Sequence, residues 1–253
     1  MTRAPRKKTE AAPSSTPEVS IVVPVHDEAG NAANLAREIA AAFQGRDYEM
    51  IFVDDLSRDS TLAELEAAKA ELPRLRVLKH GRNAGQSRAV RTGVIAARAP
   101  IVVTLDGDGQ NPPADAPRLF EALRDAPPEV ALVGGIRASR QDTEAKRWAS
   151  RWANRIRKNL LKDDCDDTGC GLKAFRREAF LRLPYFDHIH RYLPALMRRE
   201  GFENRFIDVG HRHREQGRSK YTNLGRLKAS LSDLLGVMWL NTRARNPGQV
   251  TES

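Results

Sequence analysis

Short apolar runs alternate with longer amphipathic stretches along the first half of the chain. The runs are rich in β-branched residues, which is typical of strands buried inside a sheet. Four runs are predicted to be strands: 19–25, 49–53, 75–79 and 101–105. Four stretches with apolar residues at helical spacing are predicted to be helices: 31–43, 59–72, 85–98 and 117–124. Strands that alternate with helices predict an α/β fold with a parallel sheet.

The pattern changes after a further apolar run at 130–133. A basic segment, a turn with glycine and cysteine, a mixed region and an apolar stretch at 231–240 follow. We expect four parts in the chain: a basic disordered tail at 1–17, one α/β domain at 18–222, a C-terminal amphipathic helix at 223–243 that faces a membrane or a partner, and a disordered tail at 244–253. The apolar stretch is too short to span a bilayer, which takes ~20 residues.

Composition and charge narrow the class of protein. The chain is 40% hydrophobic and 30% charged, as in ordinary globular proteins, and its two cysteines are too few for a disulfide framework. A reducing cytoplasm fits this composition. The net charge of +9 is concentrated at 137–162, where nine basic residues face two acidic ones. This segment indicates an anionic partner, namely phosphate groups, a membrane surface or nucleic acid, although a solvated helix face is an alternative.

Three pairs of carboxylates follow predicted strands. They are Asp27 with Glu28, Asp54 with Asp55, and Asp106 with Asp108. Because the carboxyl ends of parallel strands meet at one edge of a sheet, these side chains are predicted to converge on one crevice, where open α/β sheets bind ligands. Asp106 and Asp108 are separated by one glycine and supply two oxygen ligands suited to Mg²⁺ or Mn²⁺ beside a substrate's phosphates.

Six motifs occur in an order that resembles the family 2 glycosyltransferases of GT-A fold. Four lie in the first half: VVPVHDE at 22–28, VDDLSRDST at 53–61, NAGQ at 83–86 and DGDGQ at 106–110. Two later ones are DTGCGLKAFRR at 167–177 and REQGRSKY at 214–221. These later motifs resemble the polyprenyl-phosphate glycosyltransferases, the group of dolichol-phosphate mannose synthase and bacterial undecaprenyl-phosphate enzymes. The resemblance implies a Rossmann-like, mostly parallel sheet flanked by helices, with amphipathic C-terminal helices.

The resemblance also implies roles for individual residues. Nucleotide-sugar binding falls on Pro24, Val25, Glu28, Asp54, Asp55, Asn83, Gln86, Asp106, Gly107 and Asp108. The divalent metal ion is expected to be bound by Asp106, Asp108 and Gln110. Arg214, Ser219 and Lys220 match the late motif and are assigned to the acceptor phosphate, and catalysis is assigned to Asp108, Asp167 and Arg214. Arg137 and Arg140 are further candidates for binding the acceptor phosphate, because the geometry of a guanidinium group suits a phosphate. The family usually has glycine where this chain has Leu56, and Tyr-Asn where it has His26-Asp27.

The expected reaction is inverting transfer of a sugar from a UDP- or GDP-sugar to a polyprenyl phosphate of undecaprenyl type. Such a phosphate has a second pKa of about 6 and is already a charged nucleophile, so it mostly needs no general base. Asp167 is therefore expected either to act as a base or to orient a basic group or the sugar. The alternatives are transfer to a sugar hydroxyl or other non-prenyl acceptor and, less favoured, a nucleotidyltransferase. Nucleic acid is not an expected partner, because the acidic clusters would repel its backbone.

Two helices are candidates for holding such an enzyme at the inner face of the cytoplasmic membrane. Trp148, Trp152, Ile156 and Leu160 recur every four residues within the basic segment, which is typical of an interfacial helix. Packing of this stripe against the protein's own sheet is the alternative. The stretch at 231–240, with Trp239, is the second candidate. An anionic membrane surface, a membrane-protein partner and a second copy of the chain are the expected partners of these helices.

Overall fold

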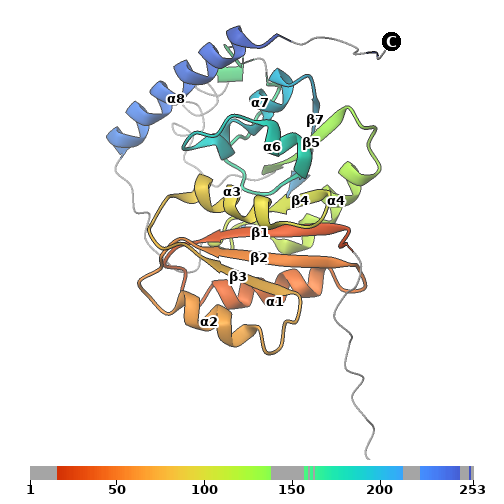
Figure 1. The fold of residues 1–253 in the computed structure, drawn as a ribbon, viewed down its shortest axis with the longest axis vertical. Helices are drawn as coiled ribbons and strands as arrows, with labels where there is room; N and C mark the ends of the chain where they lie inside the picture. Colours follow the sequence, from red (N-terminus) through yellow and green to blue (C-terminus); the bar gives the residue numbers. More distant parts are fainter. Residues whose placement is uncertain are drawn as a thin grey trace, which may run out of the picture.

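A computed structural model of the chain describes residues 16–137, 157–158, 160–161, 163–212, 223–245 and 251. Within them, seven strands form one sheet in the order β3-β2-β1-β4-β6-β5-β7 (Figure 1). The strands are β1 (Val19–Val25), β2 (Tyr48–Asp54), β3 (Leu75–Lys79), β4 (Ile101–Thr104), β5 (Val130–Arg137), β6 (Lys173–Arg176) and β7 (Glu203–Val209). β6 pairs antiparallel with β4 and β5, and the other pairs are parallel. The predicted α/β class with a mostly parallel sheet is confirmed.

Helices cover both faces of the sheet. They are α1 (Ala32–Ala42), α2 (Thr61–Ala68), α3 (Gln86–Ala96), α4 (Ala116–Arg124), α6 (Arg177–Arg182), α7 (Leu193–Arg199) and α8 (Asn223–Arg243), with short 3₁₀ turns η1 (Pro113–Asp115) and η2 (Ile189–Arg191). Figure 1 shows α1 and α2 on the side of the sheet opposite to α3. Alternate residues of one strand serve the two cores: Ile21 packs with α1 and α4, and Val22 packs with α3.

The register of β1 brings the predicted site together. Val25, the last residue of β1, pairs with Asp54 of β2, and Val22 pairs with Thr104 of β4. The chain leaves β1 for β2 and β3 on one side and returns to β4 on the other. A crevice at such a reversal of strand order is where open α/β sheets bind ligands. The carboxyl ends of β1, β2 and β4 therefore meet at one edge of the sheet.

Some expected features fall outside the described residues. Trp148, Trp152 and Ile156 of the proposed interfacial helix lie there, as does nearly all of the predicted basic tail. The apolar stretch at 231–240 lies within α8, which contacts α7 and buries Val237 in the core. No helix in the described part of the chain is both long enough and apolar enough to cross a bilayer.

Candidate active site

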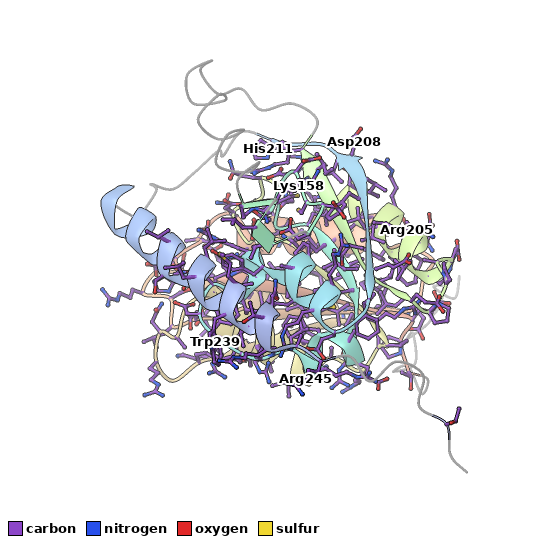
Figure 2. The ribbon with its side chains drawn as sticks, turned by 90° about the horizontal axis from the view of Figure 1, so that it is seen from above. Lys158, Arg205, Asp208, His211, Trp239 and Arg245 are labelled. Atoms are coloured by element: carbon purple, nitrogen blue, oxygen red, sulfur yellow. The ribbon has the colours of Figure 1, made fainter. Side chains whose placement is uncertain are left out.

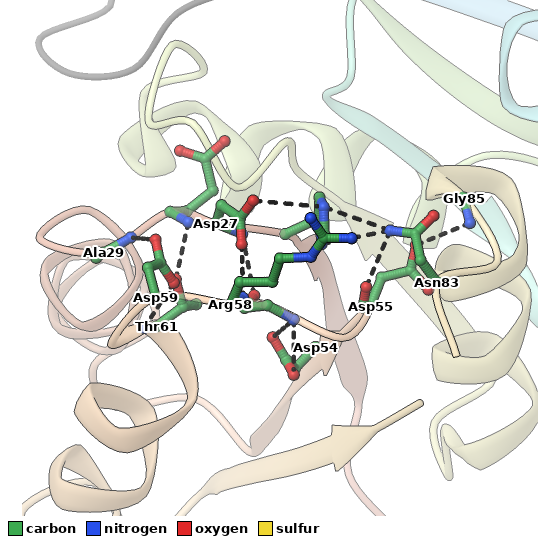
Figure 3. A network of polar contacts seen from close by, with 12 residues as sticks. Asp27, Ala29, Asp54, Asp55, Arg58, Asp59, Thr61, Asn83 and Gly85 are labelled. Carbon is green, nitrogen blue, oxygen red and sulfur yellow. Dashed lines mark hydrogen bonds and ion pairs between the residues drawn. The ribbon is translucent and has the colours of Figure 1, made fainter. Parts of the chain in front are cut away.

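The loop after β1 is fixed by the residues that begin α2. Its backbone N–H groups donate to side chains of the segment 57–64, far away in the sequence (Figure 3). Asp27 N donates to Ser57 Oγ (3.0 Å), Glu28 N to Thr61 Oγ1 (2.8 Å), Ala29 N to Asp59 Oδ2 (3.1 Å) and Gly30 N to Glu64 Oε2 (2.8 Å). These bonds hold the main chain of the loop beside the sheet edge, so that Glu28 has a defined position there.

The two carboxylates after β2 organise the main chain around them. Asp54 is fully buried and accepts the backbone N–H of Ser57 at 3.2 and 3.4 Å. Asp55 is 3% exposed and accepts N–H groups from Ala84 at 2.8 Å and Gly85 at 2.7 Å, and its Oδ1 lies 2.7 Å from His80 Nδ1. Asp55 therefore fixes the loop that leads into α3.

Asn83 connects this loop to the end of β1. Its side-chain amide donates to the backbone oxygen of Asp55 at 3.1 Å and lies 3.3 Å from the ring of His26 (Figure 3). The structure thus groups Asn83 with the loops after β1 and β2, as the predicted nucleotide pocket requires. Pro24 and Val25, at the end of β1, border the same edge.

Leu56, between these loops and α2, has a left-handed backbone with φ of +60°. Glycine adopts this conformation without strain, whereas a residue with a branched or bulky side chain does so at a cost in free energy. We expect Leu56→Val to lower the free energy of unfolding by roughly 1–2 kcal/mol, because β-branched residues tolerate positive φ worst. Leu56→Gly should stay within about 1 kcal/mol of the parent.

Urea unfolding monitored by circular dichroism measures both changes. Leu72→Val is the matched control, since Leu72 is half-buried and its φ is not positive. If Leu56→Val cost no more than this control, backbone strain at Leu56 would be absent.

Asp106 and Asp108 follow β4 and differ in their surroundings. Gln86, the first residue of α3, donates from Nε2 to Asp106 Oδ1 at 2.8 Å. Asp108 Oδ1 accepts the backbone N–H of Gln110 at 3.1 Å. The backbone oxygen of Gln110 accepts the backbone N–H of Arg212 at 2.9 Å. Burial, with the negative charge of Asp108, raises the pKa of Asp106 to about 6. A cation at this point would neutralise two carboxylates that repel each other.

The residues present fit a divalent ion that shares its coordination with substrate. Among the described residues, no group of three or more His, Cys, Asp or Glu side chains is arranged to hold a metal. Mg²⁺ is often bound by one or two carboxylates and completed by substrate phosphates. Asp106 and Asp108 would hold the ion, and Gln110 is the further ligand proposed from the sequence.

Two glycines allow the main chain to approach this pair closely. A methyl group at Gly107 would lie 2.7 Å from Pro24 O and from Val25 Cγ1, so Gly107 lets the loop pack on β1. A methyl group at Gly171 would overlap the carboxylate of Asp106. The sequence identified Gly107, but it indicated no role for Gly171, which precedes β6 and is a neighbour of the site only in three dimensions.

We expect Gly171→Ala to displace the Asp106 carboxylate without unfolding the protein, because a side-chain end moves more easily than a backbone. A displacement of about 1 Å at a catalytic centre lowers the rate roughly 10²-fold. Sugar transfer and the melting temperature should be measured together. Gly81→Ala is the matched control, since nothing lies within 4 Å of its added methyl group. Normal transfer by Gly171→Ala would show that the contact with Asp106 has no functional role.

A buried ion pair lies beside the carboxylates. Asp167 accepts from both Nε and Nη2 of Arg137 at 2.7 Å, and from the Arg137 N–H at 3.3 Å. The side chains are 8% and 14% exposed, respectively. The hydrogen bonds from Arg137 to Asp167 raise the pKa of the guanidinium, which stays charged. Arg137 is therefore already held by Asp167, and any contact it makes with an acceptor phosphate is made from this fixed position.

Lys173 is a second buried cation that the sequence reasoning did not single out. It is 4% exposed, its ammonium donates to the backbone oxygen of Cys170, and its charge lowers the pKa of Asp106, against the larger effect of burial. Arg137 acts on Asp106 in the same direction. The signal in the sequence was a lysine next to the apolar residues Leu172, Ala174 and Phe175, because a buried strand seldom contains a charged side chain without a partner.

The structure thus brings together most of the predicted residues. The three acidic pairs lie at the carboxyl ends of β1, β2 and β4. Arg137, at the end of β5, forms an ion pair with Asp167. Four predicted residues lie outside the described part of the chain: Arg140, Arg214, Ser219 and Lys220.

Comparison with known proteins assigns the chain that carries this site to a family. The family model described as glycosyl transferase family 2 matches residues 20–183. An undecaprenyl-phosphate 4-deoxy-4-formamido-L-arabinose transferase of Shewanella sediminis is 35% identical over 207 residues, which are 80% of this chain and 61% of the relative. The Pseudomonas aeruginosa protein of the same name is 37% identical over 224 residues, 87% of this chain and 65% of the relative. The chain thus spans less than two thirds of these relatives' length.

Solved structures with the same fold are more distant in sequence. Glucosyl-3-phosphoglycerate synthase from Mycobacterium tuberculosis in complex with UDP has a TM-score of 0.67 at 19% identity, covering 92% of this chain and 82% of that one. Its complex with Mn²⁺, UDP and phosphoglyceric acid has a TM-score of 0.67 at 17% identity, covering 92% and 81%. These likenesses show the fold, and they confirm the GT-A class expected from the sequence.

Proposed function

The chain belongs to glycosyl transferase family 2, and we propose that it transfers a sugar from a nucleotide-sugar donor to a polyprenyl phosphate. The observation that carries the proposal is the carboxylate pair Asp106 and Asp108, placed where the strand order reverses between β1 and β4. The relatives are named as undecaprenyl-phosphate transferases, and these names support a polyprenyl phosphate as the acceptor. We infer that the sugar enters lipid-linked glycan or lipid modification of the cell envelope.

The donor nucleotide would occupy the edge formed by the loops after β1 and β2. Glu28 and Asn83 stand at this edge on main chain fixed by long-range hydrogen bonds. Asp54 and Asp55 are committed to backbone N–H groups, so they shape the pocket through the loops that they hold. Structural neighbours contain UDP, which favours uridine over guanosine as the base.

The diphosphate would lie over Asp106 and Asp108. A divalent ion bound there supplies positive charge that stabilises the leaving diphosphate. The neighbouring synthase has been crystallised with Mg²⁺ and with Mn²⁺, each with UDP, which supports either ion. Gln86 holds Asp106 in place through one oxygen, and Gly171 leaves room for that carboxylate.

The acceptor phosphate would approach from the side of Arg137 and Lys173. One of its oxygens forms a bond to the anomeric carbon, while the bond from that carbon to the diphosphate breaks and its electrons leave with the nucleoside diphosphate. This single displacement inverts the anomeric centre. Because the phosphate is already ionised near neutral pH, Asp167 serves to orient Arg137 and accepts no proton. Arg140, Arg214, Ser219 and Lys220 remain the proposed further contacts of the phosphates. We place the enzyme at the inner face of the cytoplasmic membrane, where a membrane protein or a second copy could join it.

A donor and acceptor panel tests this function. Purified protein is incubated with labelled UDP- and GDP-sugars, Mg²⁺ or Mn²⁺, and vesicles that contain undecaprenyl phosphate. Label should enter the lipid phase with one donor, and EDTA should abolish the transfer. Phosphoglycerate and a sugar hydroxyl acceptor serve as the comparison arms. Label in a water-soluble product only would overturn the prenyl-phosphate assignment and retain the transferase.

A further inference from the structure

One face of α8 carries large apolar side chains that touch water. Leu231, Leu235 and Trp239 are each 58% exposed. They are four residues apart, so they lie in one row along the helix. Among the described residues, the only other large apolar side chains that are exposed are Ile95 and Leu160. We call Leu231, Leu235 and Trp239 the outer row.

The adjoining face of α8 packs against the core and thereby fixes the direction in which the outer row points. Val237 is 1% exposed, and Leu234 and Met238 pack against the same core as α3 and α7. Two polar contacts tie the helix down: Asp233 Oδ2 lies 2.8 Å from His188 Nδ1, and Arg199 Nε donates to Leu240 O at 3.2 Å. The helix runs along the outside of the molecule (Figure 1), and Figure 2 shows Trp239 near the C-terminal end of α8. The outer row is therefore held away from the core.

The exposed charges that follow the outer row at the end of α8 are positive. Asp233 is the only acidic residue between 231 and 245, and its carboxylate bonds His188. Arg243 and Arg245 are exposed, and the guanidinium of Arg243 lies 5.7 Å from the centre of the Trp239 ring. Tryptophan and arginine are suited to the boundary between water and lipid, where an apolar body is buried and a polar end stays hydrated.

We propose that the outer row of α8 lies on an anionic lipid bilayer, with Arg243 and Arg245 on the headgroups. Contact of this surface with lipid would bring the active site to a lipid acceptor. Only this consequence rests on the proposed function. Binding of this kind combines buried apolar area with attraction to anionic lipid, so it should weaken with salt. It depends on no residue of the basic segment at 138–156.

Vesicle flotation tests the surface directly. The parent should float with vesicles of phosphatidylglycerol and phosphatidylcholine, and less with phosphatidylcholine alone. The triple variant Leu231→Gln, Leu235→Gln, Trp239→Gln should bind at least about tenfold more weakly, because its apolar contact area is removed. Arg243→Gln with Arg245→Gln should lose the preference for anionic lipid. Ile95→Gln is the matched control, since it removes an apolar side chain of similar exposure (55%) from α3.

Unchanged flotation of the triple variant would overturn the proposal, as would a dimer of the parent that the triple variant fails to form. Transfer to a short-chain, water-soluble prenyl phosphate separates the two proposals. If the proposed function holds, the triple variant keeps this transfer and loses only transfer to acceptor in vesicles. If the parent transfers sugar to no prenyl phosphate, the proposed function fails, while the flotation result still decides the role of α8.

Discussion

Asp106→Asn and Asp108→Asn are each expected to lower the rate of sugar transfer by roughly 10³-fold. Each variant removes one charged ligand and keeps the volume of the side chain. Charge stabilisation by a bound metal contributes several kcal/mol to a transition state, and about 1.4 kcal/mol corresponds to a factor of ten in rate. Asn at 106 still has an oxygen for Gln86, so the loop should keep its shape.

Initial rates over a range of Mn²⁺ concentrations measure the effect, and calorimetric titration of Mn²⁺ with UDP measures the metal affinity. Asp125→Asn is the matched control, because Asp125 is exposed, is not one of the site residues and accepts hydrogen bonds from its neighbour Arg124. Near-normal turnover of both site variants would show that these carboxylates do not hold a catalytic metal.

Asp106→Asn, which should lower the rate of transfer, is expected to raise the stability of the metal-free protein. The pKa of Asp106 rises from 3.8 to about 6 on folding, so the native state binds this proton more tightly than the unfolded chain does. Between these pKa values the free energy of unfolding falls as the pH increases. Above about pH 6 the carboxylate is ionised in both the folded and the unfolded state, and the loss of stability is complete. Without metal, Asp106→Asn should therefore be more stable than the parent at pH 7.5 by on the order of 1–2 kcal/mol. The difference should vanish near pH 3.5 in urea titrations, and added Mn²⁺ with UDP should reduce it at pH 7.5.

Local patterns were sufficient to predict the strands that carry the site. The run at 19–25 coincides with β1, because a strand buried on both faces is a nearly continuous apolar run. The run at 75–79 coincides with β3, a partly buried edge strand in which apolar and basic residues are mixed. Helix ends were less well predicted. The helix expected at 59–72 spans Thr61–Ala68, since Asp59 is used to bond the neighbouring loop and Pro73 disfavours helical backbone at Leu72. The strand expected at 130–133 continues to Arg137.

The polar partners inside the site could not be predicted from spacing. Asp167 and Arg137 are 30 residues apart, and each was assigned a separate role in the sequence. Their pairing depends on where β5 ends relative to the loop before β6, which is set by the whole sheet. Lys173 and Gly171 were overlooked for the same reason, because their neighbour Asp106 lies more than 60 residues away.

The buried pair Arg137–Asp167 should be the most sensitive part of the site to loss of one partner. Asp167→Asn leaves the Arg137 guanidinium buried without its counter-charge, which typically costs 3–5 kcal/mol of folding free energy. We expect a stability loss of about 3 kcal/mol in urea unfolding, and a fall in transfer of roughly 10²-fold where the variant is folded, because Arg137 loses its orientation. Arg137→Gln should show changes of similar size.

A double-mutant cycle distinguishes an orienting carboxylate from a catalytic base. If Asp167 acts through Arg137, the variant with both Asp167→Asn and Arg137→Gln should transfer sugar no more slowly than either single variant, because residues that act as a unit are non-additive. The pH profile of the rate should then keep its acidic limb in Asp167→Asn, since that limb belongs to the acceptor phosphate with its pKa of about 6. Additive losses, together with disappearance of the acidic limb, would instead assign proton abstraction to Asp167. The cycle should be run at saturating metal with a soluble prenyl phosphate, so that neither metal affinity nor membrane binding contributes to the difference.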